Sequence, residues 1–211
     1  MIIDIVSDLH GSYPKLEGGD LLILGGDYTA RDTLGEYLLL SHWVRKQKYK
    51  KIIMIGGNHD MRISHGGRYF LDHVEAAWLE DSGCEWEGLE FWGSPWTAWF
   101  KGINPRCKAW VLQNEKELAK KWKLIPEGID ILITHSPPYG ILDEVIHDGV
   151  SEHVGSKSLL DVSLWIQPKV HIFGHIHEGY GQFKTENTLF INASHMDVNY
   201  IPVNKPVRIE L

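Results

Sequence analysis

Residues 52–60 have the sequence IIMIGGNHD, in which a run of large apolar residues ends at two glycines and three polar residues. A short continuous apolar run that ends at a glycine turn is typical of a strand buried on both faces. We therefore expect a strand over residues 52–55. Asn58, His59 and Asp60 would then lie just beyond its carboxyl end.

Four other segments repeat this pattern. Apolar runs over residues 1–6, 21–24, 129–133 and 170–173 each lead into a polar turn. These turns carry potential metal ligands, namely Asp8, His10, Asp27, His135, His175 and His177. A single Asp or His after a strand is usually a turn former or a helix cap. Because ligands bind at the carboxyl ends of strands in open α/β sheets, five such strand ends instead indicate one shared metal site.

Helix-like stretches lie between these runs and favour a layered α/β fold. Residues 34–47 and 110–121 have apolar side chains at steps of three and four, which predicts helices. Residues 182–185 and 188–192 flank an Asn-containing turn and predict an antiparallel hairpin. We also expect a strand over residues 89–93, and loops around residues 61–69 and 143–156.

The length and the absence of a linker indicate one domain over residues 1–211. A chain of 211 residues can bury one sizeable core but is short for two independent ones. No low-complexity tract or internal repeat divides it.

Composition also restricts the location and the partners. No apolar run is long enough for a membrane span, and the N-terminus does not resemble a signal peptide. Two isolated cysteines, Cys84 and Cys107, indicate neither a disulfide framework nor a thiolate zinc site, so we expect a reducing cytoplasmic setting. A net charge of −7 argues against a surface for duplex nucleic acid.

Taken in order, the strand ends contain Asp-x-His, Gly-Asp, Gly-Asn-His-Asp, a single His, and Gly-His-x-His. This set resembles the calcineurin-like metallophosphoesterase superfamily. Within it, the chain is similar to the small metallophosphoesterase-domain proteins. That similarity rests on residues 93–96, 134–140, 174–181, 192–194 and 199–204. The resemblance implies an α/β fold, a β-sandwich of two mixed sheets flanked by helices.

The resemblance also implies a division of the ligands between two divalent ions. Asp8, His10 and His177 would hold one ion, Asn58, His135 and His175 would hold the other, and Asp27 would bridge them. Carboxylates and imidazoles without thiolates suit transition metals, and we expect Mn²⁺ ahead of Fe, Zn²⁺ or Ni²⁺. The charge of two such ions would let an acidic protein bind a phosphate ester.

In this resemblance a water activated between the ions attacks phosphorus, and His59 protonates the departing oxygen. Asn58 would also contact the substrate. Three roles remain open for Asp60: it orients His59, it braces the loop, or it is a turn acid bonded to nearby backbone.

The sequence favours a small phosphodiester, such as a cyclic nucleotide, over a phosphoprotein. Tyr28-Thr29-Ala30-Arg31 after Asp27, and Asp60 where protein phosphatases have Glu, depart from the protein Ser/Thr phosphatase pattern. Superfamily nucleases acting on DNA are larger than this chain. Trp96, with Trp99 and Phe100, could stack on a nucleobase or could simply be packed.

Two alternatives stay open. One is a phosphomonoesterase or protein phosphatase, and the other is a non-catalytic interaction scaffold on the same fold. The ligand set separates the scaffold from the enzyme, because a scaffold has no need of seven metal-capable side chains. The sequence makes no prediction of oligomeric state.

Overall fold

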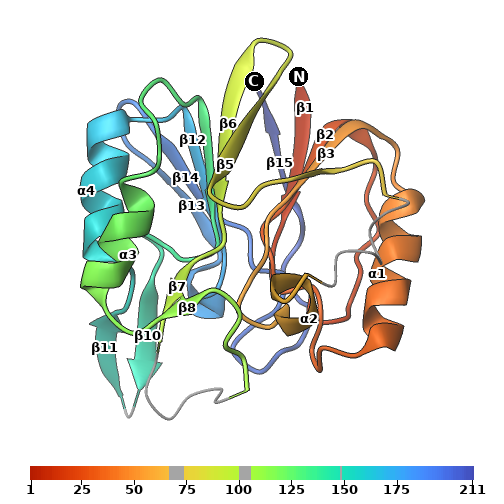
Figure 1. Cartoon of the computed structure of the whole chain (residues 1–211), viewed down its shortest axis with the longest axis horizontal. Coiled ribbons are helices and arrows are strands. Elements are labelled where there is room, and N and C mark those ends of the chain that lie inside the picture. The colour runs from red at the N-terminus through yellow and green to blue at the C-terminus, as the bar shows by residue number, and fades with distance from the viewer. Residues whose placement is uncertain (67–73, 100–105, 148) are drawn as a thin grey trace.

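The computed structural model describes residues 1–66, 74–99, 106–147 and 149–211 (Figure 1). Two β-sheets face each other, and helices lie against their outer faces. Helix α1 (Leu34–Arg45) covers one sheet, while α3 (Glu115–Trp122) and α4 (Lys157–Ile166) cover the other. The expected α/β sandwich of two mixed sheets flanked by helices is confirmed.

The first sheet has the strand order β15-β1-β2-β3-β4. Its strands are β1 (Ile2–Val6), β2 (Gly19–Leu24), β3 (Tyr49–Met54), β4 (Ala77–Trp78) and β15 (Val207–Glu210). Strands β1 to β4 are parallel, and β15 pairs antiparallel with β1. The carboxyl ends of β1, β2 and β3 therefore share one edge of this sheet.

The second sheet has the order β13-β14-β12-β9-β6-β5. Its strands are β5 (Ser82–Trp86), β6 (Leu89–Ser94), β9 (Ile131–Thr134), β12 (Val170–Phe173), β13 (Gly181–Lys184) and β14 (Leu189–Asn192). The four central strands are parallel, and β13 and β5 add antiparallel edges. The predicted C-terminal hairpin is β13–β14.

The remaining elements are short and lie near the carboxyl ends of the central strands. They are α2 (Met61–Ser64), β7 (Thr97–Ala98), β8 (Val111–Leu112), β10 (Glu144–His147), β11 (Val150–His153) and the 3₁₀ turn η2 (His177–Gly179). Figure 1 shows α2, the β7–β8 pair and the β10–β11 hairpin at the lower end of the sandwich, opposite the two termini.

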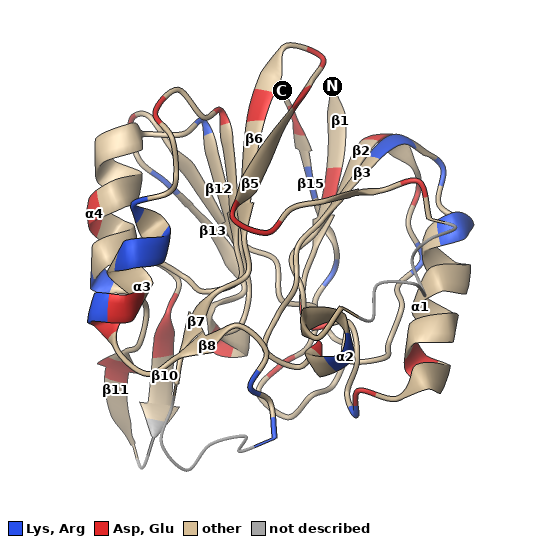
Figure 2. Cartoon of the chain, viewed as in Figure 1, with Lys and Arg blue, Asp and Glu red and all other residues tan. Residues whose placement is uncertain are grey.

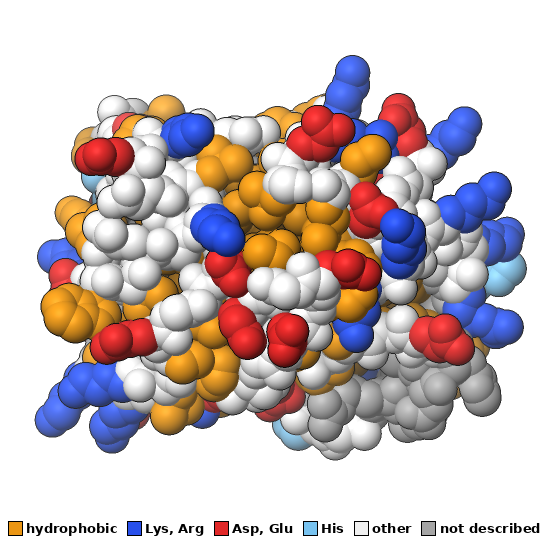
Figure 3. All heavy atoms as spheres, turned by 90° about the horizontal axis from the view of Figure 1, so that it is seen from above, with side chains coloured by type: hydrophobic (Ala, Val, Ile, Leu, Met, Phe, Trp, Pro, Cys, Tyr) orange, Lys and Arg blue, Asp and Glu red, His pale blue; other side chains and the backbone are white. Residues whose placement is uncertain are grey.

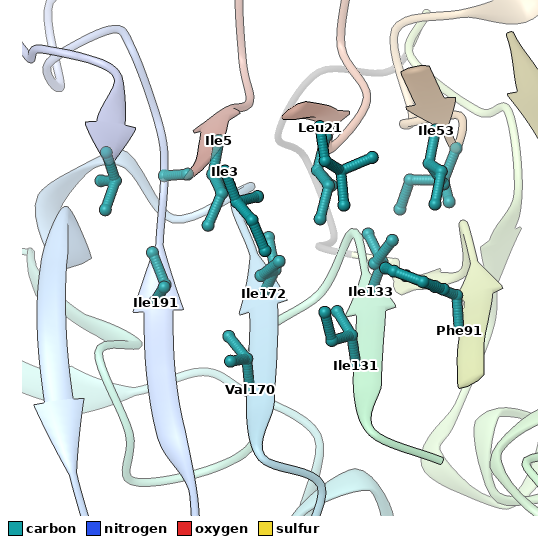
Figure 4. Packing of buried hydrophobic residues seen from close by; sticks show 14 of the residues in the cluster. Ile3, Ile5, Leu21, Ile53, Phe91, Ile131, Ile133, Val170, Ile172 and Ile191 are labelled. Carbon is teal, nitrogen blue, oxygen red and sulfur yellow. The ribbon is translucent and has the colours of Figure 1, made fainter. Parts of the chain in front are cut away.

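The main core fills the space between the sheets. Figure 4 shows Ile3, Ile5, Leu21 and Ile53 pointing at side chains of the facing sheet. Alternate residues of the same strands, such as Leu22 and Met54, pack with α1 in a second cluster. Both faces of these strands are therefore covered, which is why their sequences are continuously apolar.

The two ends of the sandwich differ. Figure 3 looks onto the end where the termini lie, and hydrophobic side chains gather at its centre with acidic and basic residues around them. Figure 2 shows the charged residues mainly on helices and connecting segments, while the strands are mostly uncharged. No helix in the described parts of the chain is both long and apolar enough to cross a membrane.

Three expectations about local structure were wrong. The helix predicted from Trp110 begins only at Glu115, because Val111–Leu112 pairs with β7 and Asn114 caps α3 by accepting the Glu117 N–H at 3.1 Å. The loop expected over residues 143–156 contains the β10–β11 hairpin, and the loop expected over residues 61–69 begins with α2. Residues 67–69 of that second loop lie outside the described residues. These elements are short, so tertiary contacts rather than local periodicity determine them.

Candidate metal centre

The carboxyl ends of five parallel strands from the two sheets meet at one end of the sandwich. Three groups of side chains there have ligand atoms within 4.8 Å of one another: Asp8, His10 and His177; His10, Asp27 and His59; Asp27, His135 and His175. The seventh predicted ligand, Asn58, has its Oδ1 3.1 Å from Nε2 of His135. The structure thus brings all seven predicted ligands, and His59, into one cluster.

Glycines at the strand ends allow this close approach. A Cβ on Gly57 would lie 2.3 Å from Asp27 Oδ1, and a Cβ on Gly174 would lie 2.0 Å from Asp8 Oδ2. Asp8, Asp27 and His175 also adopt left-handed backbone conformations, with φ of 54°, 55° and 70°. Such conformations are unfavourable for residues with a side chain and are typical of functional sites.

Asp60 holds the loop that carries Asp27. Its Oδ2 accepts the backbone N–H of Asp27 at 2.9 Å and of Gly57 at 3.0 Å, and its Oδ1 accepts that of Tyr28 at 3.0 Å. Burial, followed by the charge of Asp27, raises the pKa of the Asp60 carboxyl well above its ordinary value. The bond from Gly57, three residues away, is that of a turn acid. The bonds from Asp27 and Tyr28, which are 33 and 32 residues away, match the bracing alternative.

Two of the histidines are fixed by backbone carbonyls. His135 Nδ1 donates to the Gly25 carbonyl at 2.9 Å, and His177 Nδ1 donates to the Asp197 carbonyl at 2.9 Å. Their Nε2 atoms then face carboxylates, 3.4 Å from Asp27 Oδ2 and 3.5 Å from Asp8 Oδ1. Ring orientation by a hydrogen bond at the far nitrogen is characteristic of metal-binding histidines.

Asp8 is held by donors from the second sheet. It accepts the His175 N–H at 3.0 Å and the Ser194 hydroxyl at 3.0 Å. Ser194 was not among the predicted site residues. It lies two residues after the end of β14 and bonds to Asn192, so the same strand-end pattern could have indicated it.

Burial and neighbouring charges together lower the pKa of Asp27 and shift the pKa values of the histidines in opposite directions. Burial raises the pKa of Asp27, but the imidazoles of His135 and His59 outweigh it and hold that pKa well below its ordinary value. Burial lowers the pKa of His10 to about 4 and that of His175 to about 3. Burial also lowers the pKa of His135, but the Asp27 charge outweighs it and raises that pKa to about 9. A cation bound here would therefore displace a proton from His135.

The side chains of the cluster have the chemistry of a metal-binding site. Both ring nitrogens of His10 are buried and have no hydrogen-bond partner among the described residues. Leaving such a group unsatisfied costs about 1–3 kcal/mol. Within the same described residues, the ion pairs of Asp8 and Asp27 are with histidines and not with Lys or Arg. Buried carboxylates and an unsatisfied imidazole fit a divalent transition metal.

His59 lies beside this cluster. Its backbone N–H donates to Asp27 Oδ1 at 2.8 Å, and its Nε2 is 4.0 Å from Asp27 Oδ2. Its ring meets that of His10 edge-on, with 4.5 Å between centroids. On the other side, its Nδ1 lies 3.4 Å from the thiol of Cys107. Nothing in the sequence pattern pointed to Cys107.

A cavity of about 470 Å³ opens onto the centre, with Asn58, His175 and His177 in its lining. Trp99 lines it, whereas Trp96 does not. The Trp96 indole N–H donates to Asp81 at 2.9 Å, and Lys121 Nζ lies 3.9 Å from its ring centroid. This placement does not support Trp96 as a substrate contact. Phe100 lies outside the described residues.

Known proteins match this chain in sequence and in fold. A family model of calcineurin-like phosphoesterases matches residues 1–179. Human metallophosphoesterase domain-containing protein 1 is 36% identical over 233 residues, covering 98% of this chain and 69% of that protein. The structure of phosphopantetheinyl hydrolase from Mycobacterium tuberculosis has a TM-score of 0.67 at 14% identity, covering 98% of this chain and 95% of that one.

A putative 5′-nucleotidase from Staphylococcus aureus has a TM-score of 0.54 at 12% identity, covering 90% of this chain and 48% of that one. At these identities the two structures show the fold alone. The family model and the human relative match this chain in its amino-acid sequence. The predicted resemblance is therefore confirmed. This chain belongs to the calcineurin-like phosphoesterase family.

Proposed function

We propose that this protein is a two-metal phosphoesterase that hydrolyses small phosphodiesters. The observation that carries the proposal is the buried cluster of carboxylates and imidazoles, including the unsatisfied ring of His10. Two members of this cluster, His175 and His177, line a cavity. An interaction scaffold would gain nothing from such a cluster, because unsatisfied buried groups destabilise a fold.

The proposed ligand division is supported by the distances. Asp8, His10 and His177 form one group, and His135 and His175 form another with Asp27. Asp27 Oδ2 lies 3.8 Å from His10 Nε2 and 3.4 Å from His135 Nε2, so one carboxylate oxygen faces a histidine of each set. This position suits Asp27 as the bridging ligand. Asn58, bonded to His135, completes the second set.

Bound divalent ions would lower the pKa of a water at this site and neutralise charge on the phosphoryl oxygens. We expect Mn²⁺, with Fe, Zn²⁺ and Ni²⁺ as alternatives, because imidazole and carboxylate accept all of them. Asn58 lines the cavity and can donate its amide N–H to a phosphoryl oxygen. His59, whose Nε2 lies 4.0 Å from Asp27 Oδ2, would give a proton to the departing oxygen, and Asp60 would keep the Asp27 loop in position.

A diester, such as a cyclic nucleotide, is favoured over a phosphoprotein by the departures from the protein phosphatase pattern around Asp27 and Asp60. Both sheets share one core, so we propose that residues 1–211 act as one domain. Cys84 and Cys107 are free thiols, which is consistent with a cytoplasmic setting.

The experiment that tests this function uses metal-stripped protein supplied with Mn²⁺, Zn²⁺, Fe²⁺ or Ni²⁺. We expect hydrolysis of bis-p-nitrophenyl phosphate to return with at least one metal and to exceed that of p-nitrophenyl phosphate. His10→Ala should abolish turnover, whereas His42→Ala, on the exposed side of α1, should retain it. Failure of every metal with both esters would overturn the proposal, and faster monoester hydrolysis would overturn the diester assignment.

A further inference from the structure

We propose that the cavity beside the metal centre selects phosphodiesters whose second substituent is apolar and carries no further negative charge. The proposal rests on the phosphoesterase function proposed above and specifies its substrate class.

The walls of the cavity are mostly apolar and come from several separate parts of the chain. The end of β7 contributes Ala98 and Trp99, the β10 strand contributes Val145 and Ile146, and the segment after β14 contributes Val198 and Tyr200. Val111, Val154 and Ile176 complete the apolar lining. Pockets with apolar walls and a few polar groups at one end typically bind a small molecule by its apolar part and orient it by its polar part.

Several of these side chains remain accessible at the rim. Trp99 is 40% exposed, Tyr200 is 46% exposed, Val198 is 57% exposed and Ile146 is 72% exposed. Contiguous exposed apolar side chains are unfavourable in water and commonly mark a binding surface. Because they line the same cavity as Asn58, His175 and His177, the surface leads directly to the proposed metal centre.

Tyr200 connects the apolar wall to the centre. Its ring centroid lies 4.9 Å from that of His10 and 5.0 Å from that of His177. Asp197 fixes its loop, because the Asp197 carboxylate accepts the Ile201 N–H at 2.8 Å while the Asp197 carbonyl accepts His177 Nδ1. A phosphoryl group held at the centre would therefore place a neighbouring substituent against Tyr200.

The charges of the cavity disfavour polyanions. Its described lining residues include Glu152 and Glu178 but no Lys or Arg. A nucleoside polyphosphate would meet no cation in these walls to pair with its additional phosphates, and both carboxylates would repel them. An uncharged or cationic substituent meets no such penalty.

The first experiment compares methyl, butyl and hexyl p-nitrophenyl phosphates with the metal-loaded protein. All three release the same p-nitrophenolate, so only the second substituent changes. Each buried methylene can strengthen binding by up to about fourfold. We therefore expect kcat/KM to rise at least tenfold from methyl to hexyl, mainly through KM. A terminal carboxylate on the hexyl chain should remove this gain, whereas a terminal trimethylammonium should not.

Two valines with similar exposure test whether the dependence on chain length arises in this cavity. Val198 and Val203 lie in the same segment and are 57% and 58% exposed, but only Val198 lines the cavity. Val198→Ser should weaken the dependence on chain length, and Val203→Ser should leave it unchanged. Calorimetry with methylphosphonate and hexylphosphonate compares a short and a long alkyl substituent without turnover. Hexylphosphonate should bind more tightly.

The outcomes separate this inference from the proposed function. If the wild-type protein hydrolyses the methyl, butyl and hexyl esters with equal kcat/KM, the apolar selectivity is overturned. The phosphoesterase function would still stand in that case. Equal effects of the two valine substitutions would overturn the assignment to this cavity. If no ester is hydrolysed, the phosphoesterase function fails, and equal phosphonate affinities would then overturn the apolar site as well.

Discussion

The role of His59 can be tested directly by substitution. Its Nε2 lies 4.0 Å from Asp27 Oδ2, and it forms a group of possible metal ligands with His10 and Asp27, so two roles are to be distinguished: an acid and a ligand. An acid matters only for a poor leaving group. Ribose alkoxide needs the proton as the bond breaks, whereas p-nitrophenolate leaves without help.

His59→Ala should therefore lower turnover of a nucleotide diester by about 10²- to 10⁴-fold and that of bis-p-nitrophenyl phosphate by much less. Metal content, measured by elemental analysis, should stay at the wild-type value. An equal loss on both substrates would instead indicate stabilisation of charge on the phosphoryl group. Loss of metal would show that His59 is a ligand.

The two tryptophans near the cavity should respond differently to truncation. Trp96 is tied to Asp81 and Lys121, whereas Trp99 lines the cavity. Trp96→Ala should lower the free energy of unfolding by about 1–3 kcal/mol, because it removes a half-buried ring from the contact between two clusters. Trp99→Ala should mainly raise KM. Steady-state kinetics and thermal unfolding of both variants check this, and a larger KM effect in Trp96→Ala would restore it as a substrate contact.

At the scale of elements, His171 joins three parts of the second sheet and its helical cover. It lies in β12, its Nδ1 is 3.0 Å from the Ser163 hydroxyl of α4, and its Nε2 is 2.9 Å from the Thr134 hydroxyl at the end of β9. The side chain is fully buried, and burial lowers its pKa from 6.5 to about 3. His171 is thus a structural histidine outside the metal cluster.

This burial predicts a pH dependence of stability. Between about pH 6.5 and pH 3 the unfolded chain binds a proton at His171 that the folded chain does not bind. Stability from the neutral ring is thus fully present above pH 6.5 and is lost as the pH falls through that range. Tm of metal-free protein should fall on acidification, and it should fall less steeply in His171→Gln. Parallel Tm profiles for the two proteins would contradict this account.

The strands were predictable from sequence because both of their faces are buried. The apolar runs at residues 1–6 and 170–173 correspond closely to β1 and β12, and the polar turns after them carry candidate ligands. The start of α3 and the β10–β11 hairpin were not predicted, and both have one cause. Their conformation depends on partners distant in sequence, such as the pairing of Val111–Leu112 with β7.

At the scale of the whole molecule, the sequence order of motifs was sufficient to predict the family and the sandwich. It could not distinguish the roles of Asp60, because three backbone N–H groups from separate segments converge on that carboxylate only in the folded chain. It could not choose between Trp96 and Trp99 either. That choice depends on Asp81 and Lys121, which lie far from Trp96 in sequence.

We propose that two ions share Asp27 and that activity requires both of them. The direct test is a titration of metal-free protein with Mn²⁺, in which bound metal and turnover of bis-p-nitrophenyl phosphate are measured on the same samples. Turnover should rise until two ions are bound per chain, and Asp27→Ala should lose both ions and turnover together, because its removal weakens both sites and increases repulsion between the ions. Two ions per chain and near-normal turnover in Asp27→Ala would show that Asp27 does not bridge the ions.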